Sequence, residues 1–250
     1  MIDKKRIVQR LNRGYRLKEF PLLNLYILVA AFVEALAVLA DWQLLRCIKP
    51  LPLFLMLLYA HNKNAGRKFL VPTLVAIALF ASCLVDLIEV VGDDSSRSVM
   101  IGVRTVAHLV YCTALTMGEK IRLYAELRWA VRAAYFGVLS LTVFGLYSIR
   151  DAVENRLIHG SFLLALSVQL CVSLWRYEIT LRSSFLFSLF GSALLLVAAW
   201  AELWLTGRVA FLLHLIYFCG HYFLMHGALH QSNLQFEINK LEDNLRKSYF

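Results

Sequence analysis

The chain has few charged residues and few prolines, and these shortages exclude several classes of protein. Only 17% of its 250 residues are charged and only four are proline, so a disordered chain and a collagen-like fibre are excluded. The five cysteines form no CxxC pair, which argues against a zinc site and a disulfide-stapled secreted domain. The sequence also has no GxSxG, Walker A, GxGxxG or HExxH motif, so the common soluble-enzyme signatures are missing.

Hydrophobic residues are what the sequence has in excess. They make up 60% of the chain, with a mean hydropathy of +0.63, against about 45–50% apolar residues in an ordinary globular domain. A soluble domain of 28.6 kDa has too little interior to bury so much apolar surface. The composition therefore predicts a membrane protein that crosses the bilayer several times.

Eight apolar stretches approach the length of about 20 residues that a membrane-spanning helix needs. We therefore predict an all-α membrane bundle of eight transmembrane helices, which occupies residues 20–230. The second stretch is short unless the span includes Arg46 and Lys49. The predicted spans are 21–40, 43–60, 69–91, 99–117, 129–148, 159–175, 184–205 and 209–230.

The positive charges predict the orientation of this bundle. With the spans numbered in order, 19 lysines and arginines fall on the side that holds both termini, and 5 fall on the other side. Because positive loops stay in the cytoplasm, we expect both termini to be cytoplasmic. The net charge of +9 then indicates contact with anionic membrane lipid and not with nucleic acid. The membrane is either a bacterial inner membrane or the endoplasmic reticulum.

Two polar segments flank the predicted membrane domain. Residues 1–19 form a basic cytoplasmic arm. Residues 231–250 form a cytoplasmic tail with one apolar helical stripe of Leu234, Ile238, Leu241 and Leu245. Such a tail is typical of an amphipathic helix lying on the membrane, and it has too few heptads for a coiled coil.

Ionisable residues inside the spans are the candidate functional residues. Each costs about 2.5–3.5 kcal/mol on insertion scales, so each needs a reason to be there. The carboxylates and the two cations all lie in the outer half of their predicted spans, which predicts a shared wet cavity open to the non-cytoplasmic side. The alternative is that they reach the interface one by one. The full set is Glu34, Lys49, Asp86, Glu89, Arg104, His108, Glu202, His214 and His221.

Helical spacing groups several of these residues on shared faces. Asp86 and Glu89 are three residues apart, and Arg104, His108 and Tyr111 follow the i, i+4, i+7 pattern. The same spacing relates His214, Tyr217 and His221. A carboxylate pair beside an arginine and histidines favours charge-assisted hydrogen bonds, either at a site or as structural links between helices. The three histidines of this set, His108, His214 and His221, show no HxxxH or HxH spacing, so we expect no metal and no other cofactor.

Several short motifs together resemble the YhhN family of eight-helix membrane proteins, which includes the lysoplasmalogenases. The run RCIKPLP at residues 46–52, after Trp42, is similar to the family's Lys-Pro-Leu motif, and Asp86 is similar to its Gly-Asp motif. His108 to Tyr111 is similar to its His-x-x-Tyr motif. The segments that begin at Gly191 and Tyr217 are similar to its last two motifs. The resemblance covers about residues 25–230.

The sequence departs from this family pattern at several positions. Val85 replaces the glycine before the aspartate, and Ala199 stands near the place of a second aspartate. Glu202, three residues later on nearly the same helical face, is the candidate to replace that aspartate. His221 stands near a family glutamine, and Arg104 stands where an aromatic residue is usual.

The resemblance implies hydrolysis of the vinyl ether bond of a lysoplasmalogen to a fatty aldehyde and a glycerophospho-base. Such a reaction needs an acid, an anion beside the oxocarbenium ion and an activated water, as in the two-carboxylate logic of glycosidases. We expect Asp86 to act as general acid or water base and Glu202 as the second carboxylate. His108 and Tyr111 would then move the proton or orient the water.

The predicted substrate is a lysophospholipid, and five further residues are expected to bind it. Lys49 and Arg104 are the candidates for its phosphate, and Glu89, Tyr217 and His221 complete the substrate-binding set. Two other readings remain open. In the first, the protein is a non-catalytic member of the same fold, which binds a lipid or a partner helix. In the second, it is a small-solute or proton-coupled transporter.

Overall fold

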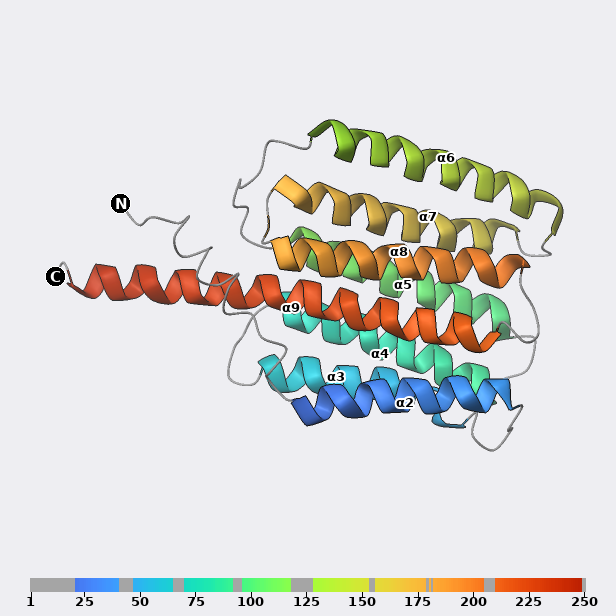
Figure 1. Cartoon of the computed structure of the whole chain (residues 1–250), viewed down its shortest axis with the longest axis horizontal. Helices are drawn as coiled ribbons and strands as arrows, with labels where there is room; N and C mark the ends of the chain where they lie inside the picture. The colour runs from blue at the N-terminus through green and yellow to red at the C-terminus, as the bar shows by residue number, and fades with distance from the viewer. Residues whose placement is uncertain are drawn as a thin grey trace.

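The computed structural model describes residues 21–40, 47–64, 70–91, 96–117, 128–152, 156–178, 180, 182–204 and 210–248. This part of the chain is all helical and contains eight α-helices and no strand (Figure 1). The predicted basic arm at residues 1–19 lies outside the described residues. The helices are α2 (Pro21–Leu39), α3 (Leu51–Asn64), α4 (Leu70–Val91), α5 (Arg97–Thr116), α6 (Arg128–Ala152), α7 (Arg156–Trp175), α8 (Arg182–Trp204) and α9 (Ala210–Ser248).

Six of the described helices are long and apolar enough to cross a membrane. They are α2, α4, α5, α7, α8 and α9. Large apolar side chains on their outer faces are exposed, among them Leu25, Val29 and Phe32 of α2. Contiguous apolar surface of this kind faces lipid in a membrane protein. The chain is therefore a multi-pass helical membrane protein.

The second helix begins later than its apolar run predicts. The predicted span covers 43–60, but α3 begins at Leu51 and follows a turn at Lys49 and Pro50. Pro50 and Pro52 explain this start, because a residue without an N–H fits only before a helix or in its first turn. With 14 residues, α3 is about 21 Å long at 1.5 Å per residue, which is shorter than the hydrocarbon layer.

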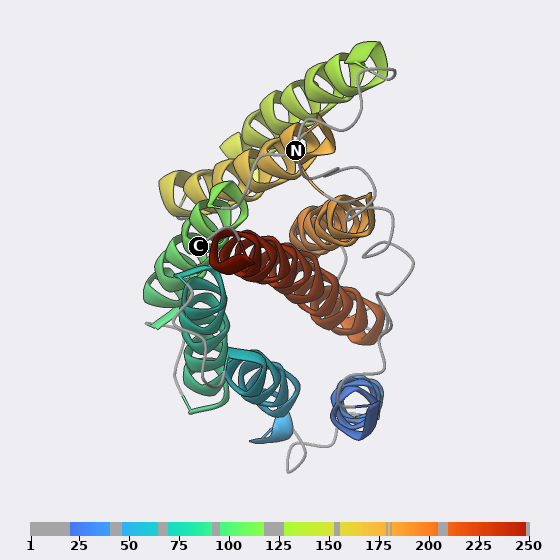
Figure 2. The same ribbon diagram turned by 90° about the vertical axis from the view of Figure 1, so that its left-hand side faces the viewer.

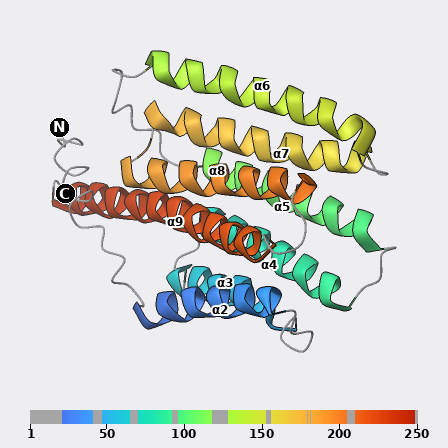
Figure 3. The ribbon, with the colours of Figure 1, turned by 45° about the vertical axis from the view of Figure 1, so that its right-hand side comes forward.

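The last helix lies at the centre of the bundle. Viewed nearly along the helices, α9 is surrounded by the others (Figure 2), and it packs against α2, α3, α4 and α8. Small residues bring α8 and α9 together: a Cβ on Gly191 would lie 2.6 Å from the backbone nitrogen of Leu224. In contrast, α6 lies at the edge of the bundle and packs mainly on α7 (Figure 3).

The polar tail continues the last helix without a break. α9 runs for 39 residues to Ser248 and projects well beyond the other helices (Figure 1). The start of α2 lies at this same end of the bundle (Figure 1). The side chains after Ser232 lie outside the described residues, so the amphipathic contact of the tail with the membrane stays a prediction.

Candidate functional site

One end of the bundle collects most of the predicted site residues, and we call it the carboxylate end. Consecutive helices run in opposite directions, so the last turns of α4 and α8 meet the first turns of α5 and α9 there. Asp86 and Glu89 lie in the last two turns of α4, and Glu202 lies near the end of α8. Arg104 lies two turns into α5. Polar residues near the ends of α4 and α8 and near the starts of α5 and α9 therefore lie at the same height along the bundle.

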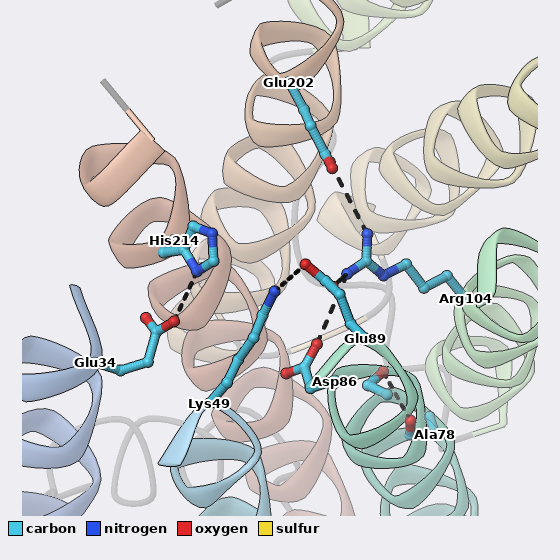
Figure 4. A network of polar contacts seen from close by, with 9 residues as sticks. Glu34, Lys49, Ala78, Asp86, Glu89, Arg104, Glu202 and His214 are labelled. Atoms are coloured by element: carbon cyan, nitrogen blue, oxygen red, sulfur yellow. Dashed lines mark hydrogen bonds and ion pairs between the residues drawn. The ribbon is translucent and has the colours of Figure 1, made fainter. Parts of the chain in front are cut away.

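Arg104 is the centre of the polar network at this end (Figure 4). Its Nη2 lies 3.0 Å from Glu89 Oε2 and 3.7 Å from Asp86 Oδ1, and its Nη1 lies 3.9 Å from Glu202 Oε2. The guanidinium carbon also lies 5.7 Å from the centre of the Tyr217 ring. One cation therefore connects carboxylates of α4 and α8, which are more than 100 residues apart in the chain.

The carboxylates of this network differ sharply in exposure. The Asp86 side chain is 0% exposed and the Glu202 side chain is 64% exposed. Glu89, with a side chain that is 40% exposed, lies between these two values and forms a second ion pair, with Lys49 Nζ at 2.5 Å. Neither carboxylate oxygen of Asp86 accepts a hydrogen bond from the part of the chain that the structure describes, and Arg104 is the cation paired with it. The network thus combines a buried carboxyl group, Asp86, with a solvent-exposed one, Glu202.

A separate pair closes the other side of the site. His214 Nδ1 on α9 lies 2.8 Å from Glu34 Oε1 on α2, so this pair is a hydrogen bond between helices. The two residues, with Lys49 and Glu89, line a pocket of about 530 Å³. This pocket brings together only part of the predicted polar set, because Asp86, Arg104 and Glu202 are not among its lining residues. Its remaining lining residues are Val38, Cys47 and Val90.

A layer of histidines lies deeper in the bundle. His108 and His221 stack with ring centres 5.8 Å apart, and Tyr111 OH lies 3.3 Å from His221 Nδ1. Tyr217 connects this layer to the carboxylate end, because its ring contacts both Arg104 and, at 4.7 Å between ring centres, His221. The predicted site residues therefore form two groups, with Tyr217 between them.

The structure gives His108 partners that sequence reasoning missed. His108 Nδ1 lies 2.9 Å from Gln169 Oε1, and Gln169 Nε2 donates to Ser192 Oγ at 3.2 Å. Ser173 Oγ lies 2.8 Å from the same hydroxyl. Gln169 is uncharged and therefore does not stand out in an apolar span. The repeat of serines at 184, 188 and 192 is the signal that identifies this polar helical face.

The described residues contain no group of side chains that is arranged to bind a metal ion. Among the residues that the structure describes, no three His, Cys, Asp or Glu side chains are grouped as they would be around an ion. The two histidines of the deep layer are instead stacked and hydrogen-bonded.

Comparison with known families matches more than half of the chain. The model of the YhhN family matches residues 44–184. The matched segment holds six of the predicted site residues: Lys49, Asp86, Glu89, Arg104, His108 and Tyr111. Comparisons with curated proteins and with solved structures gave no match.

Proposed function

This chain belongs to the YhhN family, and on that premise we propose that it hydrolyses the vinyl ether bond of lysoplasmalogens, as the lysoplasmalogenases of the family do. The products are a fatty aldehyde and a glycerophospho-base. The proposal assigns the chemistry to the carboxylate end and the substrate to the membrane around it. It also places α3 and α6 in the membrane, which gives eight spans with both termini in the cytoplasm.

The pairing of Asp86 and Glu202 across Arg104 supports this function. The chemistry needs one carboxyl group that gives a proton and one that accepts it from water. A buried carboxyl group favours the protonated acid and a solvated one favours the carboxylate. Asp86 is fully buried and Glu202 is largely exposed, yet both approach the same guanidinium within 4 Å.

The proposed reaction begins with proton transfer from Asp86 to the alkene carbon remote from the ether oxygen. The double-bond electrons form the new C–H bond, and the positive charge spreads onto the ether oxygen as an oxocarbenium ion. The Asp86 carboxylate left behind stabilises this cation.

Water completes the reaction on the exposed side. Glu202 accepts a proton from a water molecule as its oxygen attacks the oxocarbenium carbon, which forms a hemiacetal. The hemiacetal then breaks its bond to the glycerol oxygen and releases the aldehyde. Glu202 returns its proton to the glycerol oxygen, and the hydroxyl proton of the hemiacetal restores Asp86. In this scheme His108 and Tyr111 orient water from the deeper layer.

The charges and the pocket suit a lysophospholipid. Lys49 lies at the edge of the pocket and is the candidate for the phosphate, with Arg104 behind it. The exposed apolar faces of the surrounding helices give the alkyl chain a path along the bundle. The proposal places the vinyl ether bond between headgroup and chain, on the side of the site towards Asp86.

Turnover of lysoplasmalogen by the purified protein tests the proposal. In detergent, the wild-type protein should release fatty aldehyde, and Asp86→Asn should lower the rate by about 100-fold or more, as expected for loss of an acid–base group. Ser82→Ala is the matched control. Ser82 is buried one turn away on α4, and its hydroxyl donates to the Ala78 carbonyl at 3.0 Å. An Asp86→Asn variant with the wild-type rate would remove Asp86 from the mechanism.

One observation favours a second function, lipid binding without catalysis. Ala199, near the place of the family's second aspartate, is buried in the core, so this position of α8 gives the bundle interior no carboxyl group. Lysoplasmalogen that copurifies with the protein but is not consumed would support this function over hydrolysis.

A further inference from the structure

A second buried cation lies at the end of the bundle opposite the carboxylate end. Arg176 follows the last turn of α7, in a short 3₁₀ helix (Arg176–Glu178) that connects α7 towards α8. An arginine in such a connection normally extends to solvent. Arg176 is instead only 1% exposed, one of the largest fully buried side chains in the described part of the protein.

The Arg176 guanidinium is held in place but not satisfied. Its Nη2 donates to Ser184 Oγ on α8 at 2.8 Å, and Ser184 Oγ in turn donates to the Gly227 carbonyl on α9. Among the residues that the structure describes, its Nε and Nη1 have no hydrogen-bond partner. Two of the three guanidinium nitrogens are therefore buried and have no acceptor among the described side chains.

The two buried arginines have opposite electrostatic surroundings. Arg104 lies within 4 Å of three carboxylates, whereas no carboxylate among the described side chains forms an ion pair with Arg176. The other titratable groups that interact electrostatically at this end are Lys63 of α3 and His226 and His230 of α9. All of them carry positive charge or none, so the described side chains around Arg176 favour an anion.

Arg176 keeps its charge at neutral pH despite this burial. Removal from water lowers the pKa of Arg176 to about 9, which still leaves the guanidinium protonated at pH 7. A buried charge is costly unless it is paired and hydrogen-bonded. The unused N–H groups thus require an acceptor with several oxygens and a negative charge.

The level of Arg176 in the bundle identifies the anion. The apolar span of α7 ends at Trp175 and that of α8 begins at Arg182, so Arg176 lies between the ends of two spans, at the level of the lipid headgroups. Phosphate is the abundant oxyanion at that level. We propose that Arg176, anchored by Ser184, binds a phosphate group at this end of the bundle, supplied by a lipid headgroup or by free phosphate. This site lies apart from the carboxylate end and does not depend on the reaction proposed there.

A thermal stability assay in detergent tests the site on the full-length protein. Inorganic phosphate should raise the Tm of the wild-type protein in a saturable way, relative to chloride at equal ionic strength, because a ligand that binds only the folded state stabilises it. Arg176→Gln should abolish this response. Arg176→Lys, which keeps the charge but loses the planar donor set, should weaken phosphate binding about tenfold. Arg182→Gln is the matched control, because Arg182 is an exposed arginine at the same end and should leave the response unchanged.

A second arm of the experiment distinguishes the two sources of phosphate. Protein reconstituted in phosphatidylcholine with and without phosphatidic acid is extracted, and its bound lipid is counted by native mass spectrometry. A retained phospholipid that Arg176→Lys loses assigns the site to a headgroup, whereas a response to inorganic phosphate alone assigns it to the free ion. Wild-type protein with no saturable response to phosphate and no retained phospholipid overturns the proposal, even if Arg176→Gln does not fold. The proposal is also overturned if both Arg176 variants bind phosphate as tightly as the wild-type protein and the Arg182→Gln control do.

Discussion

Asp86 is the residue whose burial most needs an explanation. A carboxyl group with no exposure and no hydrogen-bond donor is unfavourable in any protein interior, and more so inside a membrane. Arg104, at 3.7 Å, supplies the compensating charge whenever Asp86 is ionised, as it is after the proposed proton transfer. The pair is therefore coupled: each residue is tolerated in the bundle because the other is present.

Removal of Arg104 should therefore destabilise the protein through Asp86. We expect Arg104→Met to lower the free energy of unfolding by roughly 3–5 kcal/mol, as when one partner of a buried ion pair is lost. Asp86→Asn in the same chain should recover a large part of this loss. Unfolding of the two single variants and the double variant in detergent measures the coupling. Additive effects would show that the two side chains do not stabilise each other.

The sequence predicts the charged residues of the site much better than their neutral partners. Lys49, Asp86 and Arg104 stand out because a charge in an apolar span is rare and costly, and helical spacing places them on faces that meet. Gln169 and Ser192 carry no charge, and which helix packs against His108 depends on tertiary structure. The sequence therefore does not reveal the bond between His108 and Gln169.

At the scale of the helices, hydropathy predicts where most of them lie but not all their ends. The described helices overlap all eight predicted spans. The prediction for 43–60 begins too early because apolar residues before Pro50 extend the run, whereas the proline determines where α3 begins. Hydropathy also does not predict that α9 continues into the polar tail, because the hydropathy falls after residue 230 while the helix continues to Ser248.

Close packing of α8 on α9 depends on glycines and gives a second prediction. Gly191→Ala should lower stability by about 1–3 kcal/mol, because its Cβ would lie 2.6 Å from the Leu224 nitrogen and 2.7 Å from the Gly220 carbonyl oxygen. The backbone cannot yield as a flexible side chain does. Gly102→Ala is the matched control, since no atom lies within 4 Å of its Cβ, and it should be neutral or stabilising by up to about 1 kcal/mol. Equal effects of both substitutions on the Tm would contradict this account.

For the molecule as a whole, the number of spans decides where the two ends of the chain lie. Eight spans and the excess of positive charge on one side predict that both ends are cytoplasmic. Short epitope tags at the two termini should both resist protease in right-side-out vesicles and both be cut after lysis. Cutting of only one tag in intact vesicles would indicate an odd number of spans, for instance because α3 does not cross.

The length of α9 has a mechanical consequence. A helix of 39 residues is about 58 Å long at 1.5 Å per residue, roughly twice the hydrocarbon thickness of a bilayer. Its first turns carry His214 and Tyr217, which form part of the wall at the carboxylate end, while its last turns stand outside the bundle. One continuous helix therefore connects the projecting tail with the wall of the site, so any tilt of this helix would move both ends together.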